Sequence, residues 1–407
     1  MLLVPLREVK IAVPRETTAG EARVALTPAA AGRLVAAGHQ VFVEAGAGGE
    51  SFPDPLYKAA KAELVRGAKA TYAHAGMVLK VRKPELAEVA LIPSGAALIA
   101  LLQPLISPDL VRALAKRKVL SFSLEAIPRI TRAQSMDALS SQATVAGYKA
   151  ALIAADSLGK LFPMLMTAAG TITPARVLVL GAGVAGLQAI ATCRRLGGVV
   201  EAFDVRAAAK EEVKSLGAGF IELELETQEG TGGYAKEQSE DFLRRQRELL
   251  AKHAAQADVV ITTALIQGRP APILLTKEML RGMKPGSVVV DIAAEAGGNV
   301  EGTEPGRVVV KNGVQIHGVT NPAGMVPAVS SELLSKNLTN LLALLVKDGE
   351  LAPDFEDEIV KGCCITRDGE VVHEPTRKAM GEKVARGGDR AQAAPSTVEK
   401  GGAHPSS

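Results

Sequence analysis

The sequence predicts an α/β protein with two doubly wound domains that are joined by long helices. Short runs rich in β-branched residues alternate with Ala- and Leu-rich stretches along most of the chain, as in proteins with parallel sheets. Its 407 residues are enough for two domains and a tail. Two long stretches with helical spacing, 131–155 and 331–347, fall where the chain would pass between the domains.

The first domain is predicted from strands at 10–13, 40–44, 77–81, 98–102 and 119–123, with helices between them. One of these helices, 28–37, ends at Gly38, and glycine is typical just after a helix. The helix at 331–347 would return the chain to this domain. We therefore expect a discontinuous first domain made of residues 1–130 and 331–375.

The segment around residue 131 begins the first connecting helix and carries several polar side chains. Helical spacing from 131 onward would put Gln134, Asp137 and Ser140 on one face, with Arg129 just ahead of the helix. Such a face is suited to a ribose and a carboxamide. It is equally suited to solvent and to helix capping, so spacing alone leaves both interpretations open.

The second domain is expected at residues 131–330, with strands at 177–180, 199–203, 259–263 and 288–291. Residues 222–241 interrupt its pattern with a charged, glycine-bearing stretch, and long irregular inserts of this kind are usually functional or mobile. After about residue 375 the chain becomes polar. Residues 376–407 are therefore predicted to be a disordered tail.

The strongest motif lies at residues 176–206, RVLVLGAGVAGLQAIATCRRLGGVVEAFDVR. Gly181, Gly183 and Gly186 form G-x-G-x-x-G between an apolar strand and a helix. A second strand ends in Asp204, 18 residues after Gly186. Because the whole strand–turn–helix–strand context is present, the motif predicts a Rossmann-like domain that binds a dinucleotide.

Each part of this motif has a physical role. Gly181 makes the tight turn, Gly183 lets the pyrophosphate approach the backbone near Val184, and Gly186 allows close packing of helix on strand. Asp204 should accept hydrogen bonds from the adenosine ribose and repel a 2′-phosphate. The motif thus predicts NAD(H), although Arg206 could accommodate that phosphate. FAD, another ribose-containing ligand and an empty site are the alternatives.

Composition excludes several other functions. Aromatic residues make up 3% of the chain, Trp is absent and the net charge is +3, so we expect no nucleic-acid partner. The six histidines are scattered without metal-ligand spacing, and we expect no metal. Three cysteines suit a reducing compartment, and neither a signal peptide nor a clean membrane-spanning run is visible. We therefore predict a cytoplasmic protein.

Beyond these patterns, the chain resembles the NAD(H)-binding alpha subunit of proton-translocating NAD(P) transhydrogenases. The resemblance extends to about residue 375. It is carried by RVALTP at 23–28, PRITRAQSMDALSSQ at 128–142, GAGVAGLQAI at 181–190, FDVR at 203–206, GGYAKE at 232–237, DIAAEAGGNVEGTEPG at 291–306 and DEIVKGCCITRDG at 357–369. Alanine dehydrogenases share the fold and several of these motifs, but RAQSMD and GGYAKE are specific to the transhydrogenases.

The resemblance implies a fold, an activity and partners. NADH would bind in a cleft between two Rossmann-like domains and pass a hydride directly to NADP held by an NADP(H)-binding subunit. A membrane-spanning proton-channel subunit would couple this transfer to proton movement. The chain would then be active only with its partners, form a homodimer, and lie at the cytoplasmic face of the membrane.

The resemblance also implies roles for individual residues. Arg129, Gln134, Asp137 and Ser140 would position the nicotinamide end. Tyr234 would lie on a mobile loop that closes over the nucleotide. The other residues expected near the ligand are Gly181, Gly183, Val184, Gly186, Asp204, Val205, Arg206, Gly233, Gln246 and Leu265.

Two other functions remain open from the sequence. An alanine dehydrogenase-like amino-acid oxidoreductase needs a titratable acid/base, usually His. Here Arg23 is present, but Arg82 stands at the expected Lys position, Gln103 at the expected His position and Glu295 at an expected Asp position. Hydride transfer between two nicotinamides needs no such proton exchange. A non-enzymatic NAD-binding module is the other alternative.

Overall fold

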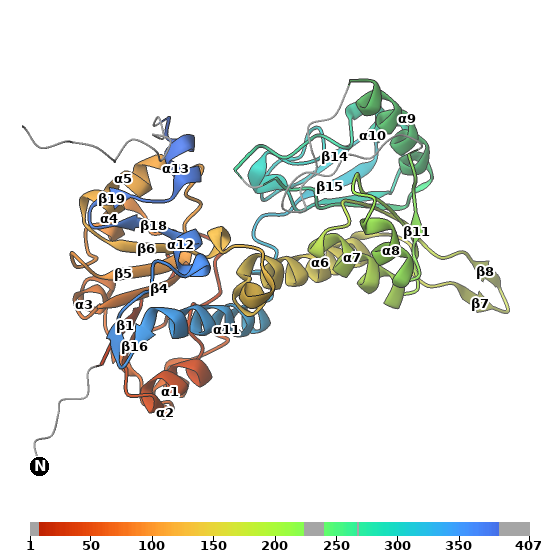
Figure 1. Cartoon of the computed structure of the whole chain (residues 1–407). Helices are drawn as coiled ribbons and strands as arrows, with labels where there is room; N and C mark the ends of the chain where they lie inside the picture. The colour runs from red at the N-terminus through yellow and green to blue at the C-terminus, as the bar shows by residue number, and fades with distance from the viewer. Residues whose placement is uncertain (1–7, 224–239, 267, 382–407) are drawn as a thin grey trace, which may run out of the picture.

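The computed structural model describes residues 8–223, 240–266 and 268–381, which form two lobes (Figure 1). Each lobe is built around a mostly parallel sheet. The strand order is β3-β2-β1-β4-β5-β6-β18-β19 in the first lobe and β11-β10-β9-β12-β13-β15-β14 in the second. Both sheets thus contain the arrangement in which the first strand lies at the centre and the chain then proceeds in both directions. The predicted fold class is confirmed.

The first lobe combines an early and a late part of the chain. Its parallel strands are β1 (Lys10–Val13), β2 (Gln40–Glu44), β3 (Glu63–Val65), β4 (Met77–Arg82), β5 (Ala97–Leu101) and β6 (Leu120–Ser123). Two antiparallel strands, β18 (Cys364–Arg367) and β19 (Glu370–Val371), extend the sheet beyond β6. The helical segments are α1 (Pro28–Ala36), α2 (Asp54–Ala59), α3 (Ala68–Ala73), α4 (Leu86–Val89), α5 (Pro108–Lys116), η1 (Leu124–Ala126), α12 (Glu358–Cys363) and α13 (Glu374–Ala379).

The second lobe is continuous in sequence. Its parallel strands are β9 (Arg176–Leu180), β10 (Val199–Phe203), β11 (Gly219–Phe220), β12 (Val259–Thr262), β13 (Val288–Asp291) and β15 (Val314–Gly318), with β14 (Val308–Lys311) antiparallel at the edge. The helical segments are α7 (Val184–Arg195), α8 (Ala209–Ser215), α9 (Glu240–Gln256), α10 (Lys277–Gly282) and η3 (Ala294–Ala296). A hairpin, β7 (Leu165–Thr167) and β8 (Gly170–Ile172), projects from this lobe (Figure 1).

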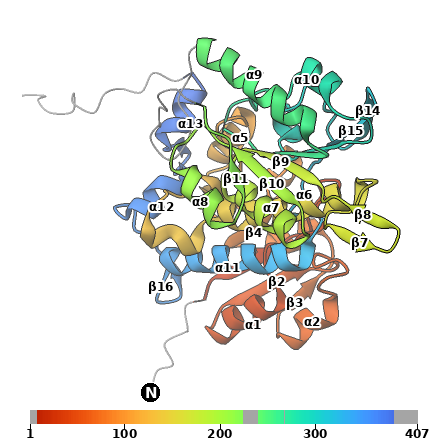
Figure 2. The same ribbon diagram turned by 90° about the vertical axis from the view of Figure 1, so that its right-hand side faces the viewer.

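Two long helices connect the lobes, as predicted. These are α6 (Ala138–Ser157) and α11 (Pro327–Leu345), which pack against each other and run between the sheets (Figures 1 and 2). A short hairpin, β16 (Val346–Lys347) and β17 (Glu350–Leu351), follows α11. The helix α11 begins at Pro327, four residues before the predicted start, because proline suits the first turn of a helix.

The predicted continuous helix from residue 131 is wrong at its start. Residues Thr131–Met136 form a separate 3₁₀ segment, η2. Asp137 then leaves the helical conformation, with φ −70° and ψ 86°, and its side chain caps α6. Asp competes for backbone N–H groups in this way, and that ends one helical segment and starts the next. The domain boundaries given above stay a prediction.

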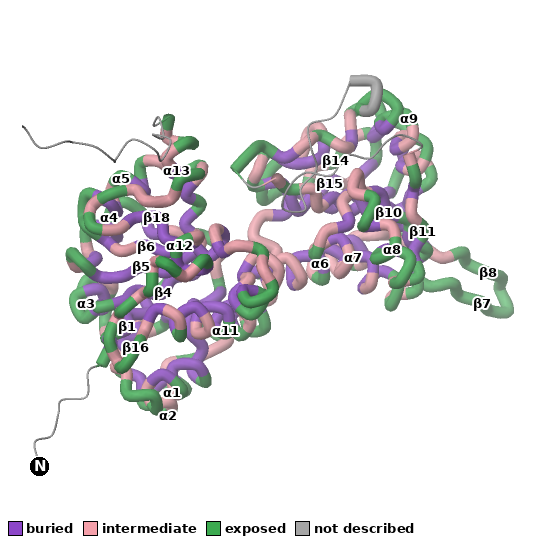
Figure 3. Tube along the Cα trace, in the orientation of Figure 1, coloured by how far each residue is buried: buried purple, intermediate pink, exposed green. Residues whose placement is uncertain are grey.

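Burial follows the two sheets (Figure 3). The strands β12 and β13 are buried along their whole length, as parallel strands covered on both faces are. The three thiols Cys193, Cys363 and Cys364 are free and buried. Burial raises the pKa of the Cys364 thiol to about 12 and also raises the pKa of its neighbour Cys363, so neither is poised to react as a thiolate. Within the described ranges, the structure holds no helix that is long and apolar enough to span a bilayer.

Two partly buried histidines make the stability depend on pH. Burial lowers the pKa of His39 and of His317 below the ordinary 6.5, and one ring nitrogen of each lacks a hydrogen-bond partner among the described residues. The unfolded chain therefore binds these protons first as the pH falls. We expect stability that is complete above pH 6.5 to decrease below it. Thermal unfolding between pH 8 and pH 5 checks this, and a His39→Gln, His317→Gln double variant should show a flatter profile.

Candidate functional site

The candidate site lies where the strand order of the second sheet reverses direction. β9 lies between β10 and β12, and sheets of this kind bind ligands beyond the carboxyl ends of strands at such a point. β9 ends at Leu180, immediately before Gly181, and β12 ends at Thr262, just before Leu265. The structure thus brings the glycine-rich turn and Leu265 to one edge of the sheet.

Two of the three motif glycines are required by the packing of the chain itself. Gly181 has φ +98°, and a Cβ there would lie 2.8 Å from Oγ1 of Thr263. That hydroxyl donates a hydrogen bond of 3.0 Å to the Gly181 carbonyl. A Cβ on Gly186 would lie 1.9 Å from the same carbonyl oxygen. Gly186 therefore allows the helix to pack closely on the strand, as the motif predicts.

Gly183 differs from both. Its φ of −74° is accessible to any residue. Among the described residues, the nearest atom to a Cβ built there is Nη2 of Arg206, at 4.0 Å. No packing within the described chain explains the glycine, which leaves open space at the point where a pyrophosphate would approach. The residues present thus fit a bound dinucleotide.

The helix α7 begins at Val184, directly after Gly183. In the described part of the chain, no side chain caps this helix end. The first N–H groups of a helix have no partner within the helix, and they carry the positive end of its dipole. Such an end binds a phosphate through backbone N–H groups.

Asp204 closes the site from the end of β10. Its nearly buried carboxylate accepts hydrogen bonds from the Ala182 N–H at 2.7 Å and from the Arg206 N–H at 2.9 Å. The Arg206 guanidinium also donates to it through Nε and Nη2, both at 3.0 Å. A carboxylate has roughly four acceptor positions, so two more donors can be added only by sharing. Val205, between these two residues, is half-buried.

The polar segment ahead of α6 is only partly brought together. Asp137 accepts a hydrogen bond of 2.8 Å from the Ser140 N–H and one of 2.6 Å from the Ser140 hydroxyl. Arg129 and Gln134 lie exposed on the preceding segment. Gln134 belongs to η2, so the common helix face expected for it with Asp137 and Ser140 is wrong.

A glycine on α6 joins this segment to the glycine-rich turn. A Cβ on Gly147 would lie 2.0 Å from the backbone oxygen of Ala185, in the first turn of α7. Ser140 precedes Gly147 by seven residues, which is about 10 Å along a helix axis. The two polar regions therefore belong to one packed unit. Gly147 is a close-contact residue that sequence analysis missed.

The remaining predicted residues have different surroundings. Gln246 on α9 is buried, whereas Leu265 is 48% exposed. Gly233 and Tyr234 lie outside the described residues. The backbone before Leu265 is held by buried Asn299, whose amide bonds the N–H and the carbonyl of Ala264 at 3.0 and 2.9 Å. Asn299 follows two glycines in sequence, a signal that a turn search would have found.

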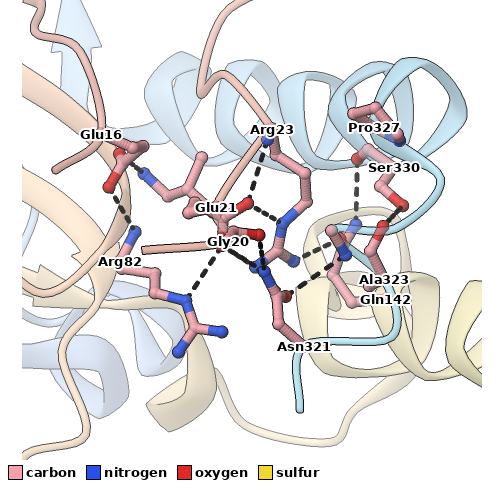
Figure 4. A network of polar contacts seen from close by, with 12 residues as sticks. Glu16, Gly20, Glu21, Arg23, Arg82, Gln142, Asn321, Ala323, Pro327 and Ser330 are labelled. Atoms are coloured by element: carbon pink, nitrogen blue, oxygen red, sulfur yellow. Dashed lines mark hydrogen bonds and ion pairs between the residues drawn. The ribbon is translucent and has the colours of Figure 1, made fainter. Parts of the chain in front are cut away.

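A second polar cluster occupies the corresponding edge of the first sheet, beside β1 and β4 (Figure 4). Glu21 lies at its centre and bonds Arg23, Arg82 and Asn321. Gln142 on α6 accepts a hydrogen bond of 2.8 Å from Arg23. The sequence analysis noted Arg23 and Arg82 but missed Glu21, Gln142 and Asn321. Among the described residues, no group of three or more His, Cys, Asp or Glu side chains is placed to hold a metal ion.

Models of one protein family match almost the whole described chain. The N-terminal domain of the alanine dehydrogenase/PNT family matches residues 12–146, and its C-terminal domain matches residues 150–374.

Individual proteins of this kind are similar to the chain. The first of the parts into which NAD(P) transhydrogenase subunit alpha of Rhodospirillum rubrum is divided is 51% identical over 375 residues, which cover 89% of this chain and 98% of that protein. NAD(P) transhydrogenase subunit alpha of Haemophilus influenzae is 45% identical, covering 89% of this chain and 71% of that protein. Alanine dehydrogenase of Bacillus subtilis is 30% identical, covering 91% of this chain and 94% of that protein.

Two solved structures share the fold. A transhydrogenase from Sinorhizobium meliloti superposes with a TM-score of 0.82 at 47% identity, covering 89% of this chain and all of that chain. An L-alanine dehydrogenase superposes with a TM-score of 0.78 at 26% identity, covering 91% of this chain and 99% of that chain.

Proposed function

Since the chain belongs to the alanine dehydrogenase/PNT family, we propose that it is the NAD(H)-binding subunit of a proton-translocating transhydrogenase. The observation that carries this proposal is the glycine-rich turn, where Gly183 leaves space that the described chain does not fill. The identity of 51% to a transhydrogenase subunit, against 30% to an alanine dehydrogenase, supports the transhydrogenase side of the family.

The chain's own residues would bind and orient the nucleotide. Backbone N–H groups at Gly183 and Val184 hold the pyrophosphate, and Gly181 and Gly186 give the turn its shape. Asp204, with Val205 and Arg206 beside it, holds the adenosine ribose, and Gln246 and Leu265 lie near the ligand. Gly233 and Tyr234, which are outside the described residues, belong to the same proposed site.

The nicotinamide end would be oriented by Arg129, Gln134, Asp137 and Ser140. When bound, NADH supplies the hydride, and NADP held by a partner subunit accepts it. Positioning is the main contribution that the protein makes to a direct transfer between two rings. No side chain needs to exchange a proton, which agrees with Gln103 standing where a dehydrogenase would carry a titratable group.

The proposed partners are an NADP(H)-binding subunit and a membrane-spanning proton-channel subunit. The Rhodospirillum relative carries a name that makes it one portion of subunit alpha, which supports a division of the complex into separate chains. We propose that this chain lies peripherally at the cytoplasmic face of the membrane through these partners.

We also propose a homodimer that uses the projecting β7–β8 hairpin. Leu165, Met166 and Ile172 on this hairpin are 42%, 71% and 47% exposed, respectively. A second copy would cover this apolar surface. A Met166→Asp variant should therefore shift the protein from dimer to monomer, as measured by light scattering after gel filtration. Leu86→Asp, at a 56% exposed site in the first lobe, is the control and should remain a dimer.

An Asp137→Asn variant should lose at least about tenfold in hydride transfer, or about 1.4 kcal/mol, while its melting temperature changes little. Asn still accepts from the Ser140 N–H and still caps α6, so the fold is retained. Asp137→Ala removes the cap and should lower stability by about 1 kcal/mol as well. Parallel losses of transfer and thermal stability in Asp137→Asn would contradict the positioning role.

The decisive experiment is hydride transfer from NADH to an NADP analogue. It is run with the purified chain, with and without a competent NADP-binding subunit. Transfer that requires both proteins is the expected result. Tight NADH binding without transfer would favour a binding module, and oxidation of alanine with NAD at ordinary enzyme rates would favour an alanine dehydrogenase.

A further inference from the structure

The polar cluster of the first lobe has the form of an anion site. It lies beside β1 and β4, where the strand order of the first sheet reverses, which is the position that binds ligands in sheets of this kind. Two arginines, Arg23 and Arg82, converge there (Figure 4). Paired guanidinium groups at such a position are suited to a carboxylate.

The carboxylate that these arginines hold belongs to the chain itself. Arg23 grips Glu21 with two parallel hydrogen bonds, Nε to Oε1 at 2.8 Å and Nη2 to Oε2 at 2.6 Å. Arg82 Nε adds a third hydrogen bond, to Oε2 at 2.9 Å. This two-pronged geometry is the one that arginine uses for free carboxylates.

Burial shows how completely Glu21 fills this place. Its side chain is 0% exposed, and that of Arg23 is 4% exposed. Burial alone would raise the pKa of the Glu21 carboxyl, but the hydrogen bonds and charge of Arg23, with those of Arg82, lower the pKa below its ordinary value. Glu21 is therefore an ionised carboxylate at neutral pH, enclosed by two cations.

The surrounding groups belong to both lobes and to the connecting helices. Arg23 Nη1 donates to Gln142 on α6, and Asn321, which follows β15, donates to Glu21 at 3.1 Å. Arg82 also reaches Glu295 in the second lobe, with an ion pair of 3.3 Å. The site thus lies at the junction of the lobes. Without Glu21, two cations would face the single, half-exposed carboxylate of Glu295.

We propose that Glu21 is a built-in occupant of this anion site and excludes small monocarboxylates from the junction of the lobes. The site would otherwise accept a ligand of the size of acetate or a short 2-oxo acid. If the proposed function holds, this exclusion reserves the hydride of NADH for a nucleotide acceptor. The exclusion itself involves no nucleotide, so it can be tested even if the proposed function fails.

The test compares Glu21→Ala with Glu21→Gln in the full chain. Alanine removes a group of the size of acetate, whereas glutamine removes the charge but still fills the space. Acetate is titrated against chloride at constant ionic strength, and binding is followed by calorimetry and by melting temperature. We expect Glu21→Ala to bind acetate at least tenfold more tightly than the wild-type chain and than Glu21→Gln. Acetate should also raise its melting temperature.

Two further variants show whether the arginines make the site. Adding Arg82→Ala to Glu21→Ala should abolish the binding of acetate. Asp357→Ala removes the carboxylate from another two-pronged pair, with Arg132, whose side chain is 53% exposed; this variant should gain no acetate binding.

If Glu21→Ala folds poorly, refolding yield replaces the titration, and recovery in acetate but not in chloride is the expected result. Equal recovery in the two salts, no recovery in either, or acetate binding that survives Arg82→Ala would overturn the proposal.

Discussion

Replacing Gly183 by Ala should weaken NADH binding at least tenfold, or about 1.4 kcal/mol, while leaving the fold and its stability unchanged. The backbone at Gly183, with φ −74°, accepts alanine without strain. Among the described residues, the nearest neighbour of the new Cβ is Arg206 Nη2 at 4.0 Å, so nothing in the described chain has to move. The methyl group would instead occupy the space proposed for the pyrophosphate.

Gly186 provides the matched control, because the same substitution there should act through the fold. A Cβ at Gly186 would meet the Gly181 carbonyl oxygen at 1.9 Å, and backbone on both sides prevents an easy shift. We expect Gly186→Ala to lower the free energy of unfolding by roughly 1–3 kcal/mol, the usual cost of overpacking, and to lose NADH binding as well. NADH titration and thermal unfolding of both variants separate the two effects. Unaltered NADH affinity in Gly183→Ala would remove the main support for the proposed site.

Replacing Lys80 by Met should lower the free energy of unfolding by about 3–5 kcal/mol, the usual effect of removing one partner of a buried ion pair. The Lys80 side chain is 1% exposed on β4, and its ammonium lies 2.7 Å from Glu88 and 3.7 Å from Glu16. Tyr72 donates a further hydrogen bond of 2.9 Å to Glu88. Without the ammonium, two carboxyl groups in the interior lose their only counter-charge among these contacts.

The pH dependence of this variant gives a second measurement. Burial would raise the pKa of Glu88, but Lys80 lowers it below its ordinary value. This lowered pKa stabilises the folded state above the pKa of the unfolded carboxyl, and the stabilisation is lost as the pH falls through the folded pKa. The difference between wild type and Lys80→Met should therefore shrink on acidification. Urea unfolding at pH 7 and near pH 4 measures it.

Lys214→Met is the matched control for this pair. Lys214 is 50% exposed and forms only a 4.0 Å surface pair with Glu211. Surface pairs contribute about 0–1 kcal/mol, so this variant should unfold close to wild type. A loss of similar size in both Lys→Met variants would contradict the role given to burial.

Much of the fold could be predicted because its signals are local. The strands β1 and β2 begin and end at the predicted residues, since buried parallel strands are short apolar runs bounded by turn residues. β3 and β11 were missed, because three- and two-residue strands carry too little pattern. The start of α6 was misjudged although its signal is local as well. Asp137 is a favoured capping residue, but the apolar spacing continues across it.

The dinucleotide-binding motif is encoded locally, because the turn, the helix end and the acidic residue all lie within 31 consecutive residues. Local backbone geometry is enough to assemble those parts. The cluster around Glu21, in contrast, exists only in the folded chain. Its partners lie 61 residues away at Arg82 and 300 residues away at Asn321, and they meet only when both lobes and α6 have packed. Charge pairing at that range has no periodicity that a single sequence can show. The same packing turns Arg23 and Arg82 from two surface-type residues into the enclosed partners of one buried carboxylate.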